Sequence, residues 1–180
     1  VGFTELSNRI GPERVFALIE HLLGLAKTCV ENHGGHVIDT AGDGMLAAFG
    51  APVAVEKASL EACRAALAFR KALEAAADEL EAGFGVAPRF RAGVSGGNAM
   101  VARTGGAGLR LVGPPVNEAS RLQVLAAPGE ILVSGTIRQE TEGFVATEMR
   151  GTVEIRGFSD PVEIHALTGV TRAVTTFEGA

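Results

Sequence analysis

The stretch GGHVIDTAGDG at residues 34–44 decides the fold. It follows a helical pattern, and Gly34 or Gly35 can supply the left-handed residue that ends a helix. Residues 36–40 and 45–49 on either side of the next turn read as strands. The glycines of AGDG suit the tip of a tight hairpin between them. We therefore predict a helix followed by a hairpin that carries one carboxylate, Asp43, at its tip.

Working outward, helices alternate with strand pairs. Pro12 and Glu13 mark the start of the first predicted helix, which ends within residues 32–35. Further helices are expected at 56–81, 114–125 and 136–142, and further strands at 89–95 with 99–102 as its partner, and at 109–112, 131–134, 144–148, 152–155 and 162–167. This order predicts an α+β fold with one mixed sheet flanked by helices. We expect one domain over 1–168, truncated in its N-terminal strand, and a tail over 169–180.

Composition limits the partners of this domain. Apolar residues make up 47 % of the 180 residues, charged residues 21 %, and the net charge is −5. A negative chain offers no bulk attraction for nucleic acid or an anionic membrane, so we expect neither as a partner. If a polyphosphate binds, a few placed cations and a metal must neutralise it.

The chain shows no sign of export or membrane insertion. No apolar run nears 18 residues, and the sequence contains no signal-peptide pattern. Cys29 and Cys63 lie on apolar helical stretches without a metal or disulfide pattern, which indicates a reducing compartment. We therefore predict a cytoplasmic domain. Because the sequence starts at Val1 without an initiator Met, we expect a fragment of a longer chain.

Four segments in order resemble the class III adenylate/guanylate cyclase catalytic domain. VGFT at residues 1–4 resembles the end of the family's DIxGFT strand, and residues 34–44 resemble its GGxVx[K/E]xxGD hairpin. VGPPVNEASRL at 112–122 resembles its G[D/N]xVNxAxR helix, and 128–134 and 154–162 resemble its closing PGEIxVS and ELKG segments. The resemblance covers nearly the whole chain. It implies a ferredoxin-like, palm-type cyclase fold.

The resemblance also implies the reaction. Such enzymes convert a nucleoside triphosphate to a 3′,5′-cyclic monophosphate and pyrophosphate with Mg²⁺ or Mn²⁺ as cofactor. Hard divalent ions take oxygen ligands, and they neutralise phosphate charge during in-line attack. Asp43 corresponds to one of the family's two metal aspartates. The other is expected just upstream of Val1, beyond the printed sequence.

The remaining site residues follow by position. Asn117 and Arg121 are four apart on a predicted helix and share one face. The resemblance assigns the ribose ring oxygen to Asn117 and the α-phosphate charge to Arg121. It assigns phosphate binding to the backbone N–H groups of Phe3 and Thr4, and to Arg156, which stands where the family has Lys.

The two positions that read the base depart from the family pattern. Adenine-specific members have Lys with Asp or Thr, and guanine-specific members have Glu with Cys, whereas this chain has Asp39 and Arg110. Asp39 can accept from the N1–H and N2–H of guanine and Arg110 can donate to O6, which favours GTP over ATP. Alternatively the two side chains pair and close the base pocket. Pro114 also replaces the family's Asp or Asn.

The family works as a head-to-tail homodimer, in which one protomer supplies the metal and its partner supplies Asn and Arg. The resemblance therefore implies two shared sites. A pseudo-cyclase that serves dimerisation or regulation is the alternative of another class. A diguanylate cyclase-like palm domain is a third, and the Asn117–Arg121 helix argues against it.

Overall fold

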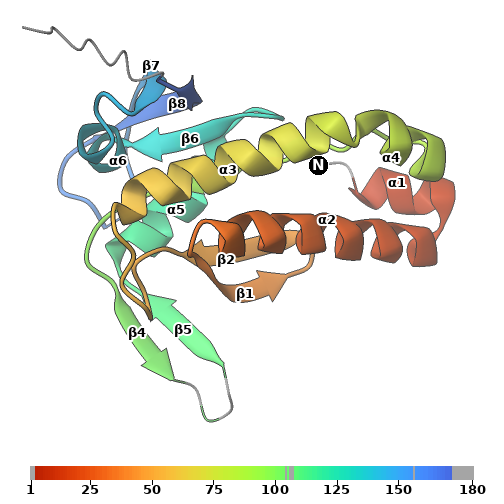
Figure 1. Cartoon of the computed structure of the whole chain (residues 1–180), viewed down its shortest axis with the longest axis horizontal. Coiled ribbons are helices and arrows are strands. Elements are labelled where there is room, and N and C mark those ends of the chain that lie inside the picture. Colours follow the sequence, from red (N-terminus) through yellow and green to blue (C-terminus); the bar gives the residue numbers. More distant parts are fainter. Residues whose placement is uncertain (1–2, 104, 106–107, 156, 172–180) are drawn as a thin grey trace, which may run out of the picture.

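The computed structural model describes residues 3–103, 105, 108–155 and 157–171 (Figure 1). Its helices are α1 (Phe3–Ile10), α2 (Pro12–Asn32), α3 (Ala58–Ala75), α4 (Ala77–Phe84), α5 (Pro114–Leu125) and α6 (Gly135–Glu140). Its strands are β1 (His36–Ala41), β2 (Gly44–Ala48), β3 (Ala92–Val94), β4 (Met100–Arg103), β5 (Leu109–Val112), β6 (Ile131–Ser134), β7 (Val145–Val153) and β8 (Val162–Val170). The predicted helix that begins at Pro12, the predicted helix 114–125 and strand 131–134 are confirmed at both ends.

A mixed sheet with helices on both faces forms the centre of the fold. Its order is β3-β6-β8-β7, with β3 parallel to β6 and the other pairs antiparallel. Alternate side chains of β6 point to opposite faces of the sheet. All four are buried because helices cover both faces. Ile131 and Val133 pack with residues of α3 and α6, whereas Leu132 packs with Leu122 of α5. The predicted α+β class with a mixed sheet flanked by helices is confirmed.

A second core joins the first four helices. Leu6 of α1 packs with Val15 and Leu18 of α2, Leu73 of α3 and Leu80 of α4. The helix α1 was not predicted, because its eight residues carry no capping signal and only a short apolar pattern. A helix of this length depends on tertiary packing for its stability, and the contact of Leu6 supplies it.

Three details differ from the sequence prediction. The segment at 99–102 does not pair with β3: β4 pairs with β5, and β3 pairs with β6. The predicted helix 56–81 divides at Ala76 into α3 and α4. The strands expected at 144–148 and 152–155 form one strand, β7, whose pairing with β8 shifts between Met149 and Gly151. For the strands, the competing pairings have the same local pattern, and partners distant in sequence decide between them.

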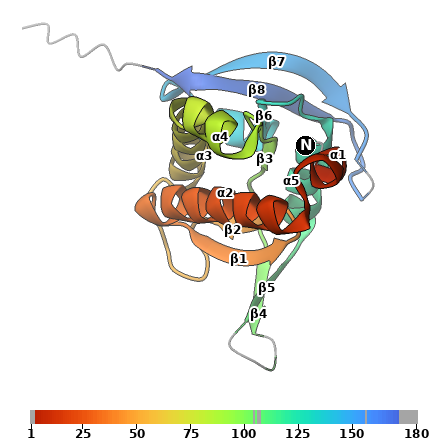
Figure 2. The ribbon, with the colours of Figure 1, turned by 90° about the vertical axis from the view of Figure 1, so that its right-hand side faces the viewer.

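Two antiparallel hairpins accompany the central sheet. The β1–β2 hairpin lies under α2, which separates it from α3 (Figures 1 and 2). The β4–β5 hairpin projects away from the rest of the molecule (Figure 1). We expected a single sheet, and the structure instead divides the strands among the central sheet and these two hairpins. None of the described helices combines the length and apolar character that crossing a bilayer requires.

Candidate active site

The β1–β2 hairpin presents Asp43 to solvent, as predicted. Gly34 adopts a φ of +74° after α2, and the chain then turns into β1. A side chain at the next residue, Gly35, would overlap the Phe49 ring and Val30, so the hairpin packs tightly against α2. Gly42 adopts a φ of +59° in the two-residue turn and Asp43 follows it. The Asp43 carboxylate is exposed and has no hydrogen bond or ion pair with the described residues.

Asp39 lies on the same hairpin, next to an irregularity in pairing. Val37 pairs with Ala47 and Asp39 with Leu46, so the register shifts between them. Such a bulge changes the direction in which the following side chains point. The Asp39 side chain is exposed, and its Oδ1 accepts the backbone N–H of Thr40 at 2.9 Å. The other carboxylate oxygen therefore remains open to a ligand.

Arg110 lies on β5, opposite Ala102 of β4, and β5 packs beside β1. The two predicted base-reading residues therefore stand on neighbouring strands. Both are exposed, and within the described part of the chain no ion pair joins them. The alternative in which Asp39 and Arg110 pair with each other gains no support from this geometry.

Asn117 and Arg121 share an exposed face of α5, as their spacing predicted. The helix begins after Gly113, whose φ of +156° and close approach to Ala99 and the Asn98 carbonyl exclude a side chain. Pro114 is the first helical residue, a position that suits its fixed φ. The opposite face of α5 packs on the central sheet through Leu122, and Ala126, which caps the helix, joins the same apolar cluster. Arg121 is therefore a cation held on a helix whose other side is anchored.

The predicted phosphate-binding residues are only partly covered. Arg156 lies outside the described residues, and so do the side chains of Phe3 and Thr4. The backbone of Phe3 and Thr4 forms the first turn of α1. N–H groups in the first turn of a helix have no partner within the helix, so they are free to bind an anion.

The described residues provide only part of a metal site. Among them, no group of three or more His, Cys, Asp or Glu side chains could hold a metal ion. The carboxylate of Asp43 fits a hard divalent ion as one ligand, since such ions take oxygen donors. Within the described structure, Mg²⁺ or Mn²⁺ would thus be held at one point by Asp43.

The cysteines and His33 have structural surroundings. Burial raises the pKa of the Cys63 thiol to about 12 and also raises that of Cys29, so both stay protonated at neutral pH. His33 Nδ1 lies 2.8 Å from Glu61 Oε2 and links the end of α2 to α3. These contacts give the two thiols and His33 a role in packing and in joining α2 to α3.

The candidate residues lie at separate places on one chain. In Figure 1 the turn of the β1–β2 hairpin, which carries Asp43, is at the end of the hairpin remote from α5. Asp39, Asp43, Arg110, Asn117 and Arg121 are all exposed. The structure thus brings together Asn117 with Arg121, and β1 with β5, but does not enclose the whole set in a pocket of a single chain.

The comparisons with known proteins agree with these motifs. A model of the family described as "Adenylate and Guanylate cyclase catalytic domain" matches residues 1–169. The chain belongs to this family. The predicted resemblance to the cyclase family is confirmed. The domain is therefore that of a cyclase enzyme.

Relatives of this cyclase domain include both nucleotide classes. Adenylate cyclase 1 of Rhizobium meliloti is 34 % identical over 98 % of this chain and 27 % of its own length. The crystal structure of the adenylyl cyclase CyaB from P. aeruginosa has a TM-score of 0.87 at 26 % identity, covering 95 % of this chain and 90 % of that one. The guanylyl cyclase Cya2 has a TM-score of 0.86 at 28 % identity, covering 97 % and 90 %. The chain spans less than a third of the length of the curated relatives it matches first.

The structure also reveals a polar residue of this cyclase domain that the sequence analysis did not consider. Glu118 follows Asn117 directly, yet only 5 % of its surface is exposed. Its Oε2 accepts a hydrogen bond from the Ser95 hydroxyl just after β3. The sequence does contain a signal, because Glu118 lies four residues before the apolar Leu122 and therefore on the buried face of the helix.

Proposed function

We propose that this domain converts a purine nucleoside triphosphate to its 3′,5′-cyclic monophosphate and pyrophosphate. The observation that carries the proposal is the exposed Asn117–Arg121 face of α5 in a domain of the cyclase family. In the reaction the ribose 3′-oxygen forms a bond to the α-phosphorus and the bond to the β-phosphate oxygen breaks. The 3′-hydroxyl proton passes to a base, and pyrophosphate leaves.

Arg121 and Asn117 have distinct roles in this proposal. Negative charge builds on the α-phosphate oxygens and the leaving group as the bond breaks. A guanidinium that is already in position stabilises that charge without reorganisation, and it does so most strongly in the transition state. Asn117 lies one helical turn before Arg121. It donates a hydrogen bond to the ribose ring oxygen and so orients the 3′-oxygen for attack. Neither role requires a covalent intermediate.

Asp43 is proposed as a ligand for Mg²⁺ or Mn²⁺. When bound, such an ion lowers the pKa of the attacking hydroxyl and neutralises phosphate charge. The Asp43 carboxylate is exposed at the hairpin tip and carries no competing partner among the described residues, which supports this role. A two-metal site needs a second carboxylate in addition to that of Asp43.

The terminal phosphates are proposed to bind at the start of α1 and at Arg156. The first-turn amides of Phe3 and Thr4 can donate to phosphate oxygens. Arg156 would add a positive charge with two parallel donors in place of the family's lysine ammonium. An R156K variant should therefore retain most activity, whereas R156A should raise the KM for the triphosphate.

We propose GTP as the preferred substrate. The open oxygen of Asp39 can accept from guanine N1–H and N2–H, and Arg110 on the adjoining strand can donate to O6. Adenine lacks the N1–H and would place a second acceptor against Asp39. Turnover of GTP and ATP with Mn²⁺ tests this, and a clear preference for ATP would contradict it. R110T separates the two readings of Arg110: it should lower activity if Arg110 reads the base and raise it if Arg110 closes the pocket.

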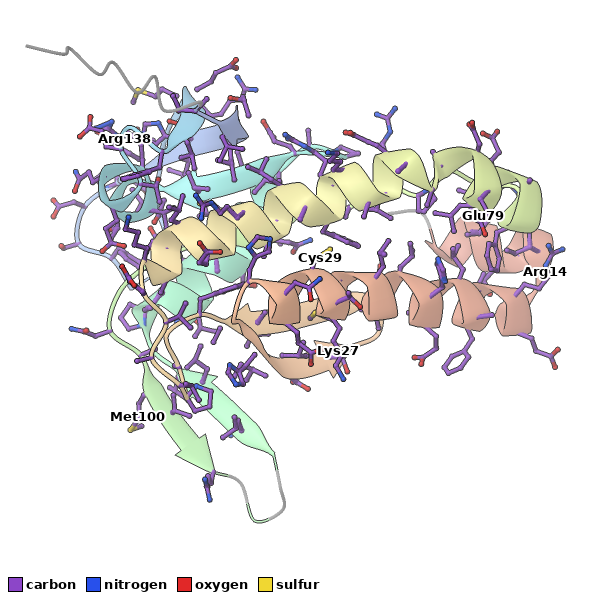
Figure 3. All side chains as sticks on the ribbon, viewed as in Figure 1. Arg14, Lys27, Cys29, Glu79, Met100 and Arg138 are labelled. Carbon is purple, nitrogen blue, oxygen red and sulfur yellow. The ribbon has the colours of Figure 1, made fainter. Side chains whose placement is uncertain are left out.

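A head-to-tail homodimer is proposed as the active form. All five described site side chains are exposed on one chain, although phosphoryl transfer is favoured where water is excluded. A second copy could cover these residues and bring its Asn117 and Arg121 to Asp43. Met100 and Val112 face each other across the projecting β4–β5 hairpin and are 64 % and 49 % exposed, and Figure 3 shows Met100 pointing away from the body of the chain. Activity that falls more steeply than linearly on dilution supports this arrangement.

A pseudo-cyclase that serves dimerisation or regulation is the second candidate. It is favoured by Asp39, Arg110 and Pro114, which depart from the family's pattern at the base and at the start of α5. Since the chain spans less than a third of its first curated relatives, the activity and the cytoplasmic location of the whole protein are part of the proposal. So are the domain bounds 1–168 and the tail 169–180.

The deciding experiment uses the full-length protein, folded and dimeric, with Mn²⁺ and separately GTP or ATP. Mass detection of a cyclic nucleotide is expected, and R121A is the matched control that should lower its rate of formation by about a hundredfold or more. No product from either nucleotide would favour the pseudo-cyclase.

A further inference from the structure

The hydrogen bond between Ser95 and Glu118 lies directly behind the exposed face of α5. Glu118 is 5 % exposed, whereas its neighbour Asn117 and the following Arg121 are open to solvent. A carboxylate is rarely buried unless it is paired, because its desolvation is costly. The Ser95 hydroxyl donates to Glu118 Oε2 and offsets part of that cost. A buried acid at this position calls for an explanation beyond packing.

Gly93 of β3 and Ser95, the residue after this strand, contact the same face of α5. Gly93 and Ser95 are two residues apart, so both face α5, while Ala92 and Val94 pack on the other side of the sheet with the Cys63 cluster. At Gly93 the backbone of α5 approaches so closely that an added Cβ would lie 2.1 Å from the Ala119 carbonyl oxygen. Gly93 thus sets the distance between helix and sheet.

The close approach at Gly93 sets the distance between α5 and β3 but is not a directional bond. Leu122 and Ala126, the residue after the helix, pack in an apolar cluster with the sheet, and apolar contacts are non-directional. A hydrogen bond is directional, so the Ser95–Glu118 contact fixes the rotation near the start of α5. Side chains extend about 5–6 Å from a helix axis, so a rotation of roughly 10° moves their ends by about 1 Å.

We propose that Ser95 and Glu118 are positioning residues that hold Asn117 and Arg121 in the orientation that catalysis needs. The inference rests on the proposed cyclase function. Glu118 does not touch the nucleotide in this scheme; it acts through the rotation of α5. A misplacement of about 1 Å can cost roughly a hundredfold in rate, so the loss of this contact should be visible in kcat.

The test compares variants that keep or lose the hydrogen bond. S95A and E118L remove it, whereas E118Q keeps an oxygen that can accept from Ser95. T141V is the control: the buried Thr141 hydroxyl donates to the Ile137 carbonyl in α6, remote in sequence from α5, so its loss reports on stability alone. In the full-length protein we expect S95A and E118L to lower kcat about tenfold or more with KM changed less than about threefold, because transition-state contacts are lost. E118Q should recover most of the rate.

A double variant separates positioning from general destabilisation. In an R121A background the further change S95A should lower the residual kcat by a clearly smaller factor than in the wild type, because one of the two groups that Ser95 positions is already absent. A kcat that falls by the same factor in both backgrounds would overturn the proposal. So would a wild-type kcat in S95A.

Hydrogen–deuterium exchange tests the proposal even if the wild-type protein makes no cyclic nucleotide. That result would reject the proposed function, yet exchange of the amides in 114–125 still reports the seating of α5. We expect S95A to raise exchange in α5 while T141V does not. Equal exchange in α5 for S95A and wild type would overturn the inference whatever the activity.

Discussion

Replacing Gly93 by alanine should be among the most damaging single-methyl changes in this protein. The added Cβ would lie 2.1 Å from the Ala119 carbonyl oxygen, 2.7 Å from the Gln123 nitrogen and 2.8 Å from Leu122 Cβ. Ordinary contact begins at 3.4 Å, so the shortest of these falls short by about 1.3 Å. Two of the three obstacles are backbone atoms, which cannot swing aside as a flexible side chain can. The helix α5 must therefore move away from β3 as a unit.

The energetic cost follows from this geometry. Overpacking costs about 1–3 kcal/mol, and a backbone obstacle places G93A at the upper end. For a domain of this size about 3 kcal/mol corresponds to a fall of roughly 6–12 °C in Tm. A shift of about 1 Å in α5 should also lower kcat by up to roughly a hundredfold, because Asn117 and Arg121 move with the helix.

Thermal unfolding followed by circular dichroism, together with the cyclase assay below Tm, measures both effects. G24A is the matched control, since Gly24 lies inside α2 and nothing lies within 4 Å of its added Cβ. Alanine is favoured over glycine inside a helix by about 1 kcal/mol, so G24A should be neutral or stabilising. A G93A protein with the wild-type Tm would refute the reasoning, because it would mean that α5 does not press on β3 as described.

Three further predictions concern single side chains. R121A should lower kcat by about a hundredfold or more with little change in KM, measured by steady-state kinetics, since the guanidinium acts mainly in the transition state; a change confined to KM would contradict this role. Burial pushes the pKa of Glu61 upward, but hydrogen bonds from His33 and Arg64 and their charges outweigh it and hold that pKa below its ordinary 4.5. The stability that Glu61 adds is therefore present above pH 4.5 and is lost as the pH falls through the lower pKa of the folded state. Urea unfolding between pH 3 and 7 should show that the free energy of unfolding falls less steeply with acid in E61Q than in the wild type. If the two proteins lose stability in parallel, the stabilising role of Glu61 is wrong. Cys63, with a pKa of about 12, should resist a thiol reagent at pH 8 in the folded protein and react after unfolding, and rapid labelling in the native state would contradict its burial.

The helices and the hairpin whose ends carry prolines or glycines could be predicted from the sequence. Pro12 and Pro114 at the first helical positions define the starts of α2 and α5, and both helices also end where their patterns end. The β1–β2 hairpin follows from its glycines, because Gly34 and Gly42 take positive φ values that other residues rarely adopt. The same spacing logic placed Asn117 and Arg121 together on one exposed face.

Which strands pair and which helices pack together was harder to predict from the sequence. The strand at 99–102 has the same local pattern whether it pairs with β3 or with β5, and only the tertiary structure shows that its partner is β5. The helix α1 has too few residues to be stable alone and exists because Leu6 enters a core shared with α2, α3 and α4. The spacing of Glu118 from Leu122 marks its face of the helix, but its hydrogen-bond partner Ser95 is known only once β3 is placed behind it.

By itself, then, the sequence determined the family, the main helices and hairpin, and the residue types of the candidate site, because capping, turn and spacing rules act over a few neighbouring residues. Only the tertiary structure decided which strands pair, how closely α5 approaches Gly93, and that the Glu118 carboxylate is buried against Ser95. These features depend on contacts between segments far apart in the chain, and their free energy appears only when both segments are in place.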